Sequence, residues 1–193
     1  MARPLRIEYP NAFYHLISRG NERKVIFQSN EDYELFLECL EEACCRFDVQ
    51  IHTYCLMPNH IHLLAQTKEA NLSQFMKRLL DVYTIRYNRR HKRYGHLFQG
   101  RYKSYLIEED NCLVALSRYI HLNPVKAGIV KHARMYPRSS MSYYLGKRYP
   151  CSSGDWGNMK RIATSGTADQ SFRKQQPPIN STEAVVQNGK SLH

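Results

Sequence analysis

The chain has 193 residues, enough for one domain with a hydrophobic core and some additional segments. Its 28 Lys and Arg against 17 Asp and Glu give a formal charge of +11, which favours a polyanionic partner such as nucleic acid, although a basic surface that only aids solubility accounts for the same charge. No apolar run approaches the length of a membrane span or a signal core, so we expect a cytoplasmic protein without membrane association.

The chain begins with a predicted strand and a predicted helix. Residues 12–19 are apolar and aromatic, which indicates a strand, and Gly20 marks a turn after it. Residues 31–47 carry apolar side chains at spacings of three and four, which predicts an amphipathic helix with Asn30 as its N-cap. The first part of this helix holds six acids and no base, which predicts a face turned away from nucleic acid: Glu31, Asp32, Glu34, Glu38, Glu41 and Glu42.

A hairpin and a second helix follow. Residues 49–57 and 61–66 are strand-like runs, and the Pro58-Asn59 pair between them reads as a turn. Asn71 can cap a helix that runs to about residue 88, with its apolar side buried and its other side basic. Tyr83 and Tyr87 fit the apolar side of this helix.

The last predicted elements are a strand over residues 101–108 and a third helix that starts at Asp110 or Asn111 and runs through His121, with Pro124 ending it. The order strand, helix, strand, strand, helix, strand is that of a ferredoxin-like split βαβ antiparallel sheet. We therefore predict an α+β fold with helices on one face of the sheet and an added C-terminal helix that bears Tyr119.

The chain divides by composition near residue 150. Residues 1–150 carry the periodic segments and form the predicted catalytic domain. Residues 151–193 lose periodicity and gain Ser, Gly, Thr, Gln and Pro, which predicts a flexible polar tail. The six cysteines include no Cys-x-x-Cys pair, so a zinc knuckle is not expected.

Basic residues concentrate between Lys77 and Lys103, where Asp81 is the single acid. This stretch predicts a phosphate-binding face, and with the acidic helix it predicts two electrostatically distinct sides. A solvated basic loop is the alternative interpretation. The nine basic residues are Lys77, Arg78, Arg86, Arg89, Arg90, Lys92, Arg93, Arg101 and Lys103.

His60 and His62 are the first candidates for a chemical role. Because strand side chains alternate, both imidazoles project from one face while Ile61 projects from the other. This spacing permits joint ligation of one metal and leaves coordination positions open for a phosphate oxygen. Two polar side chains on a solvated strand face are the plainer interpretation of the same pattern.

Tyr119 and Asn123 are four residues apart and share one face of the third helix, so the Asn123 amide oxygen is a candidate third metal ligand. A phenol is a poor nucleophile near neutral pH, and a nearby cation such as Lys126 or a metal ion would favour the phenolate. Tyr119 fits equally well into a core beside Leu116 and Ile120.

Three segments in combination resemble the REP-associated branch of the single-tyrosine HUH transposases. They are His60-Ile61-His62, the run from Tyr119 through Asn123-Pro124-Val125-Lys126-Ala127-Gly128, and the opening run from Arg3-Pro4-Leu5-Arg6 to Ser18-Arg19-Gly20-Asn21. The likeness covers roughly residues 3–145, and residues 96–104 resemble the linker of that family into its last strand.

The resemblance implies that His60 and His62 bind Mg²⁺ or Mn²⁺, whereas the imidazoles alone would equally suit zinc. It implies that Tyr119 forms a covalent 5′-phosphotyrosine link to single-stranded DNA and frees a 3′ hydroxyl, and that the reverse step rejoins strands. Insertion-sequence relatives carry Gln four residues after the tyrosine, whereas this chain has Asn123, as the REP-associated branch does.

The expected partner is single-stranded or hairpin DNA, and no small-molecule substrate is expected. Such DNA needs cations along its backbone and flat rings for its bases, and Tyr87, Tyr94 and Phe98 lie within the basic stretch. The residues expected to contact DNA are Arg6, Arg19, Arg86, Arg89, Arg90, Lys92, Arg93, Arg101, Lys103 and Lys126.

Two rival functions fit the same residues. A non-catalytic nucleic-acid-binding module or domesticated regulator would bind DNA without cutting it. A metallohydrolase that activates water would need His60 and His62 but not Tyr119. The sequence also leaves open whether Tyr119 serves its own sheet or that of a second copy in a homodimer.

Overall fold

The computed structural model describes residues 8–108 and 110–145, with the backbone alone at 110 and 111. These residues belong to one compact unit, Met1–Ala163. The predicted tail at 151–193 and the capping side chain of the third helix lie outside the described residues. The described part contains no helix both long and apolar enough to cross a membrane.

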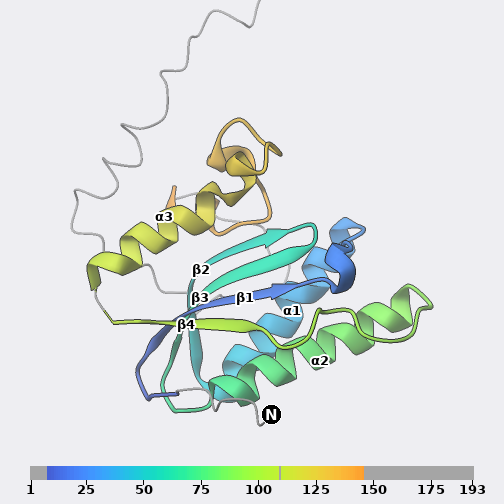
Figure 1. Ribbon diagram of the computed structural model, residues 1–193, viewed down its shortest axis with the longest axis horizontal. Helices are drawn as coiled ribbons and strands as arrows, with labels where there is room; N and C mark the ends of the chain where they lie inside the picture. The colour runs from blue at the N-terminus through green and yellow to red at the C-terminus, as the bar shows by residue number, and fades with distance from the viewer. Residues whose placement is uncertain (1–7, 109, 146–193) are drawn as a thin grey trace, which may run out of the picture. The chain divides into compact units, whose positions relative to one another are not determined.

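The main elements (Figure 1) are β1 Phe13–Arg19, α1 Asn30–Phe47, β2 Val49–Met57, β3 His60–Thr67, α2 Leu72–Arg90, β4 Lys103–Ile107 and α3 Asp110–Lys126, with the short helices η1 Asn21–Arg23, η2 Ala133–Met135 and α4 Met141–Tyr144.

The four strands form one sheet in the order β2-β3-β1-β4, and every neighbouring pair is antiparallel. This order confirms the predicted ferredoxin-like split βαβ arrangement, and β2 and β3 form the predicted hairpin. Ile17 pairs with His62 and Arg19 pairs with His60. Because residues directly opposite one another project from the same face, these four side chains share one face of the sheet.

The other face of the sheet is covered by α1 and α2 and holds the main core. The apolar side predicted for the second helix is buried there, including both of its predicted core tyrosines. The Tyr83 hydroxyl donates a hydrogen bond to the carbonyl of Ile26, so its one polar atom is satisfied. The largest fully buried side chains of this core are Tyr14, Tyr83, Tyr87, Phe36 and Phe75.

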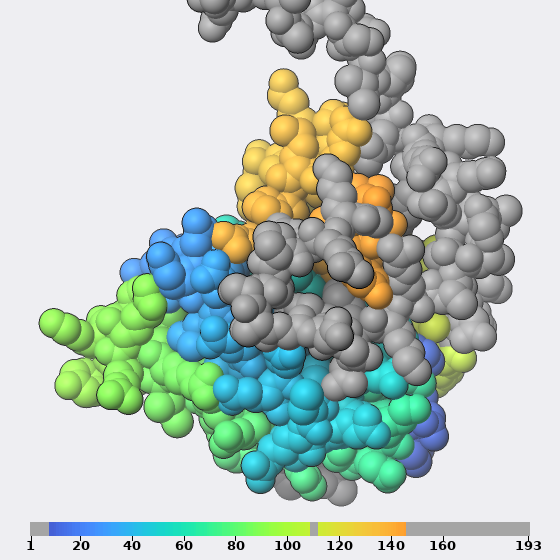
Figure 2. Space-filling view, turned by 180° about the vertical axis from the view of Figure 1, so that it is seen from behind, coloured from blue at the N-terminus to red at the C-terminus, as the bar shows by residue number. Residues whose placement is uncertain are grey.

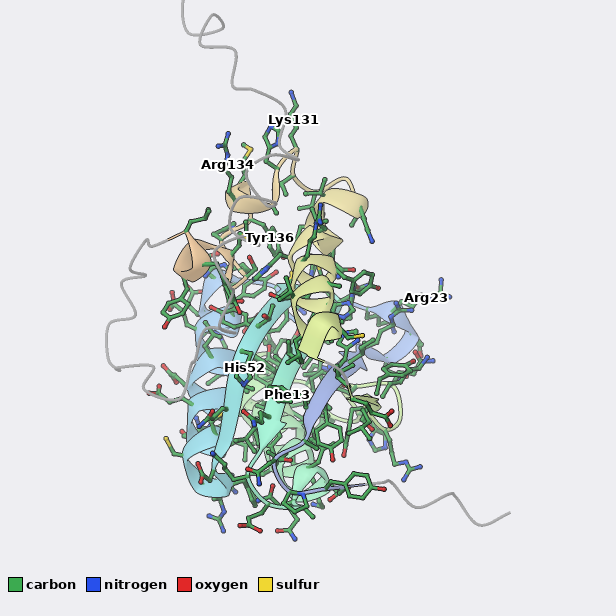
Figure 3. All side chains as sticks on the ribbon, turned by 90° about the vertical axis from the view of Figure 1, so that its left-hand side faces the viewer. Phe13, Arg23, His52, Lys131, Arg134 and Tyr136 are labelled. Carbon is green, nitrogen blue, oxygen red and sulfur yellow. The ribbon has the colours of Figure 1, made fainter. Side chains whose placement is uncertain are left out.

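α3 packs on the face that carries the histidines, chiefly over β2 (Figure 1). Ile120 of α3 lies in a second buried cluster with Cys55, Met57 and Leu64 from the sheet. Tyr136, labelled in Figure 3, belongs to the same cluster, and its hydroxyl donates to the Leu56 carbonyl at 2.7 Å. The strip of this face along β1 and β4 stays exposed, since Lys103 and half of Tyr105 face solvent.

The N-cap of α1 differs from the prediction. The helix begins at Asn30, so Ser29 and not Asn30 is the N-cap residue. The buried Asp32 carboxylate accepts hydrogen bonds from the backbone N–H groups of Gln28 at 2.8 Å and Ser29 at 3.1 Å. A carboxylate in the first turn satisfies these donors and complements the helix dipole, so the side chain of Asn30 is not required there.

The prediction that Pro124 ends the third helix is wrong, because α3 continues to Lys126. Proline provides no N–H for the carbonyl of Ile120, four residues earlier. The Asn123 side-chain Nδ2 donates to that carbonyl at 3.3 Å and to the Tyr119 carbonyl at 3.0 Å. The helical ladder resumes where the Ala127 N–H donates to the Asn123 carbonyl at 2.9 Å.

The predicted separation into an acidic side and a basic side is also wrong along the contact between α1 and α2. Arg86 of α2 forms an ion pair with Glu42 of α1 at 2.9 Å, and Arg90 lies 3.5 Å from Glu31 and 3.6 Å from Asp32. Figure 2 shows α1 in blue and cyan, with the loop after α2 in green at its edge. The two helices lie side by side, so these bases neutralise acids.

A buried histidine makes the stability of this fold depend on pH. Burial lowers the pKa of His121 to about 3, and its Nε2 lies 2.8 Å from Ser140 Oγ. A histidine in the unfolded chain titrates near pH 6.5, so below that pH the unfolded state binds more protons than the folded state. We expect His121 to reduce the free energy of unfolding by about 1–2 kcal/mol between pH 6.5 and pH 5.

Denaturant unfolding at several pH values measures this slope. The slope should be shallower in His121→Asn and unchanged in the exposed control His96→Asn. A wild-type slope in His121→Asn would contradict the prediction.

Candidate active site

His60 and His62 lie at the start of β3, with their ring centroids 5.0 Å apart. His60 Nδ1 is 2.7 Å from Asn59 Oδ1, and His62 Nδ1 is 3.0 Å from Nε2 of His15 on β1. The Nε2 atoms of His60 and His62 make no hydrogen bond to any part of the chain that the structure describes. Each ring is therefore held through Nδ1 and presents an open Nε2.

The electrostatic surroundings keep both imidazoles neutral. Burial lowers the pKa of His60 to about 4, and the nearby Arg19 charge contributes to this. Burial lowers the pKa of His62 to about 3, with further contributions from His60, His15 and Arg19. Near pH 7 both rings therefore carry the lone pair that a metal ligand needs.

α3 places Tyr119 beside His62 and His15. The Tyr119 ring centroid is 6.1 Å from that of His62 and 6.1 Å from that of His15, with the rings nearly perpendicular. Its side chain is 41% exposed, so a substrate can reach the ring from solvent. Lys126, two helical turns later, places Nζ 4.5 Å from the Tyr119 ring centroid. The tyrosine, the histidines and the lysine thus converge within one chain.

The donor set fits a divalent cation. Two neutral imidazoles with open Nε2 atoms leave coordination positions for phosphate oxygens, and a hydrogen bond at Nδ1 is the usual support of a metal-bound histidine. Within residues 8–108 and 110–145, no three His, Cys, Asp or Glu side chains gather in a possible metal cluster. The arrangement therefore suits an open site and not a closed structural one.

Asn123 follows Tyr119 by one helical turn, as predicted, but its described contacts are with the backbone of α3. Its Nδ2 donates to the carbonyls of Tyr119 and Ile120. The structure does not bring its side chain into hydrogen-bond contact with His60 or His62 among the described residues. Its predicted role as a metal ligand stays a prediction.

The exposed strip of the sheet places two of the predicted DNA-binding residues beside the histidines. Arg19 ends β1 directly opposite His60, and Lys103 lies opposite Ile17, which in turn pairs with His62. Tyr105 of β4 is 51% exposed, and its ring centroid is 6.0 Å from that of His15. Cations and an aromatic ring therefore border the candidate metal site.

Most of the other predicted DNA-binding residues lie away from this strip. Arg86 and Arg90 are held in the ion pairs with α1. Arg93 lies 5.9 Å from the Tyr87 ring centroid and lines a cavity of about 390 Å³. Of the remaining residues, Arg89 and Lys92 are exposed around the end of α2, Arg101 lines a cavity against α2, and Arg6 lies outside the described residues.

The sequence interpretation assigned no role to His15, which contacts both His62 and Tyr119. The sequence placed His15 in a predicted strand. It could not show that His15 contacts His62, because that contact depends on the register between β1 and β3. Lys131 and Arg134, which are exposed beyond the end of α3 (Figure 3), also received no role. They lie in a segment without the helical or strand periodicity used to place the other candidates.

Comparison with known proteins identifies sequences and a solved structure that are similar to this chain. Residues 8–123 match the sequence profile of the family described as "Transposase IS200 like". A relative from Haemophilus influenzae named as a REP-associated tyrosine transposase is 27% identical over 142 residues, which cover 68% of this chain and 80% of the relative. A solved REP-associated tyrosine transposase bound to a REP hairpin superposes with a TM-score of 0.64 at 17% identity, covering 83% of this chain and 98% of that one.

Substitution of Asn123 tests its two possible roles. Asn123→Ala removes both side-chain hydrogen bonds to the α3 carbonyls. The Ile120 carbonyl is then left without a donor, because Pro124 has no N–H. We expect the free energy of unfolding to fall by about 1–2 kcal/mol and Mn²⁺ affinity to stay close to wild type. Denaturant unfolding and titration calorimetry measure the two quantities. A loss of Mn²⁺ affinity of about tenfold or more would instead identify Asn123 as a metal ligand.

Proposed function

Since the chain belongs to the IS200-like transposase family, we propose that it cuts and rejoins single-stranded DNA through a covalent link between Tyr119 and a 5′ phosphate. The observation that carries this proposal is the convergence of Tyr119 with His62 and Lys126, at 6.1 Å between ring centroids and 4.5 Å from Nζ to the ring. A metallohydrolase that activates water would not require a phenol at this position, whereas a binding module would use its ring only for stacking.

In the proposed cleavage step, the Tyr119 phenol loses its proton and its Oη forms a bond to phosphorus. The bond from phosphorus to the 3′ oxygen breaks, and this oxygen takes up a proton and leaves as a 3′ hydroxyl. Attack by a 3′ hydroxyl on the phosphotyrosine reverses the step and rejoins a strand. The reaction therefore exchanges one phosphodiester for another without consuming a cofactor.

His60 and His62 are the proposed ligands of Mg²⁺ or Mn²⁺ through their Nε2 atoms. Such an ion, when bound, would polarise the scissile phosphate and offset its negative charge. The two rings contribute neutrality and fixed orientation, because burial suppresses their protonation and Nδ1 of each is hydrogen bonded. Asn123 is left out of this proposed ligand pair, because its described hydrogen bonds hold the α3 backbone, and its role as a third ligand through Oδ1 stays a prediction that Asn123→Ala tests.

Lys126 has the proposed role of stabilising negative charge on the phenol oxygen and on the phosphate. Its ammonium lies against the Tyr119 ring, so the charge is in place before DNA arrives. One chain supplies the tyrosine, the lysine and both histidines. The proposed reaction therefore does not require the tyrosine of a second copy, although it is compatible with a homodimer.

The proposed substrate is single-stranded DNA flanked by a REP-like hairpin. This substrate is carried over from the similar proteins, one of which is a REP-associated tyrosine transposase bound to a REP hairpin. Arg19 and Lys103 would bind phosphates on either side of the scissile bond, and Tyr105 would stack on a base. All three lie on the exposed strip beside the histidines. A non-catalytic binding module would use the same strip but would leave DNA uncut.

A covalent adduct is the first measurable consequence. Incubation with labelled single-stranded hairpin DNA and Mn²⁺ should give a protein–DNA adduct that survives denaturing electrophoresis. Tyr119→Phe should abolish the adduct, because phenylalanine has no oxygen to bond phosphorus. Tyr94→Phe keeps an aromatic ring at a position that is 94% exposed and removes only the hydroxyl, so this matched control should form the adduct normally.

The rival functions give different products in the same assay. Cleavage without adduct, retained in Tyr119→Phe, would indicate activated water in place of the tyrosine. DNA binding without cleavage in wild type would favour the binding module. An adduct that persists in Tyr119→Phe would contradict the assignment of the nucleophile.

The salt dependence of DNA affinity tests which protein surface the phosphate backbone of the DNA follows. Lys103→Ala should weaken binding of single-stranded DNA and lower the slope of log K against log salt concentration by about 0.7, since one phosphate contact is lost. Arg86→Ala removes the same charge from α2, where Glu42 already pairs with it, and should leave the slope unchanged. Fluorescence anisotropy at several salt concentrations measures both slopes, and the reverse result would move the DNA path to α2.

A further inference from the structure

His15 occupies a buried position beside both the candidate metal ligand His62 and the candidate nucleophile Tyr119. It lies on β1 with 7% of its surface exposed. Its Nε2 is 3.0 Å from His62 Nδ1, and its ring lies nearly parallel to that of His62, at 18°. The cleavage step described above uses neither nitrogen of this ring, so His15 has no part in it.

Hydrogen-bond chemistry fixes what His15 does in that contact. A neutral imidazole that offers the Nε2 lone pair to a cation carries its proton on Nδ1. His62 Nδ1 must then donate to the atom opposite it, so His15 Nε2 must accept. His15 therefore holds its own proton on Nδ1, and any group replacing it must present an acceptor at the same point.

His60 shows the same design with a different acceptor. Its Nδ1 faces Asn59 Oδ1 at 2.7 Å, and Asn59 Nδ2 donates to the Arg23 carbonyl at 3.1 Å, which fixes the amide orientation. A carbonyl oxygen can only accept, so His60 is also held with its proton on Nδ1. The structure thus provides one acceptor behind each candidate ligand.

We propose that His15 is a positioning residue that fixes the tautomer and ring orientation of His62, so that the His62 Nε2 lone pair faces the cation. The proposal rests on the proposed function, because it takes His62 as a metal ligand. His15 does not itself ligate the cation, since its Nε2 is directed at Nδ1 of the His62 ring and not at the Nε2 side. It acts on the metal only through His62.

Two substitutions at His15 separate the acceptor from the bulk of the ring. His15→Gln retains a carbonyl acceptor at nearly the reach of imidazole Nε2, whereas His15→Leu has none. We expect His15→Leu to weaken Mn²⁺ binding by about 10- to 100-fold and His15→Gln to restore most of that loss. Titration calorimetry with Mn²⁺ on the DNA-free protein measures the affinities. His52→Leu, at another buried histidine of the sheet, is the matched control and should bind Mn²⁺ as wild type does.

A second measurement reads the tautomer directly and needs neither metal nor activity. Long-range ¹⁵N–¹H correlation spectra of the metal-free wild-type protein should show His62 protonated at Nδ1 and unprotonated at Nε2. The opposite tautomer would overturn the proposal. This spectrum decides the matter even where His15→Leu fails to fold.

The outcomes also separate this proposal from the proposed function. If His62→Gln weakens Mn²⁺ binding but a folded His15→Leu does not, the positioning role fails and the metal site stands. If His15→Gln binds as weakly as His15→Leu, an acceptor is not what His15 supplies, and the proposal fails. If His62→Gln leaves Mn²⁺ affinity unchanged, the metal site of the proposed function fails and the positioning role falls with it.

Discussion

Antiparallel pairing between β1 and β3 holds the three histidines of the site on one face of the sheet. Ile17 lies opposite His62, so His15 falls one step along the same face, where its Nε2 reaches His62 Nδ1. A register slip of one residue would turn His15 towards the core and expose Tyr14 and Leu16. These two side chains are almost wholly buried against α1 and α2. The main core therefore sets the geometry of a site on the opposite face.

The position of Lys126 depends in turn on the continuity of α3. Seven residues separate Tyr119 from Lys126, which is two helical turns, so their side chains share a face only while the helix lasts. Pro124 interrupts the backbone hydrogen bonding within this interval, and the Asn123 amide donates to the carbonyl that Pro124 leaves without its N–H. Asn123, which its spacing from Tyr119 suggested as a metal ligand, thus stabilises the helix that carries both Tyr119 and Lys126.

Local patterns were sufficient to predict the strands, the helices and the shared face of His60 and His62, because alternation and helical spacing are properties of short segments. The sequence interpretation was wrong where a distant or nonstandard partner decides the outcome. Proline disfavours a helix interior because it provides no N–H, and in α3 the Asn123 side chain donates to the carbonyl that Pro124 leaves without a partner. The acids of α1 were predicted to form a separate surface because the sequence does not show that α1 and α2 are neighbours. In the fold these acids pair with Arg86 and Arg90 of α2. His15 became visible as a site residue only with the strand register.

The same tertiary pairing changes what the net charge of +11 means for DNA. Two arginines of the basic stretch are offset by carboxylates of α1, so their field at the surface is small. Among the residues that the structure describes, Arg19, Lys103 and Lys126 have no acidic partner within ion-pair distance. His60 and His62 add no charge near neutral pH. The uncompensated charge at the site therefore comes from three cations around two neutral histidines, which suits the negative charge of a phosphate group.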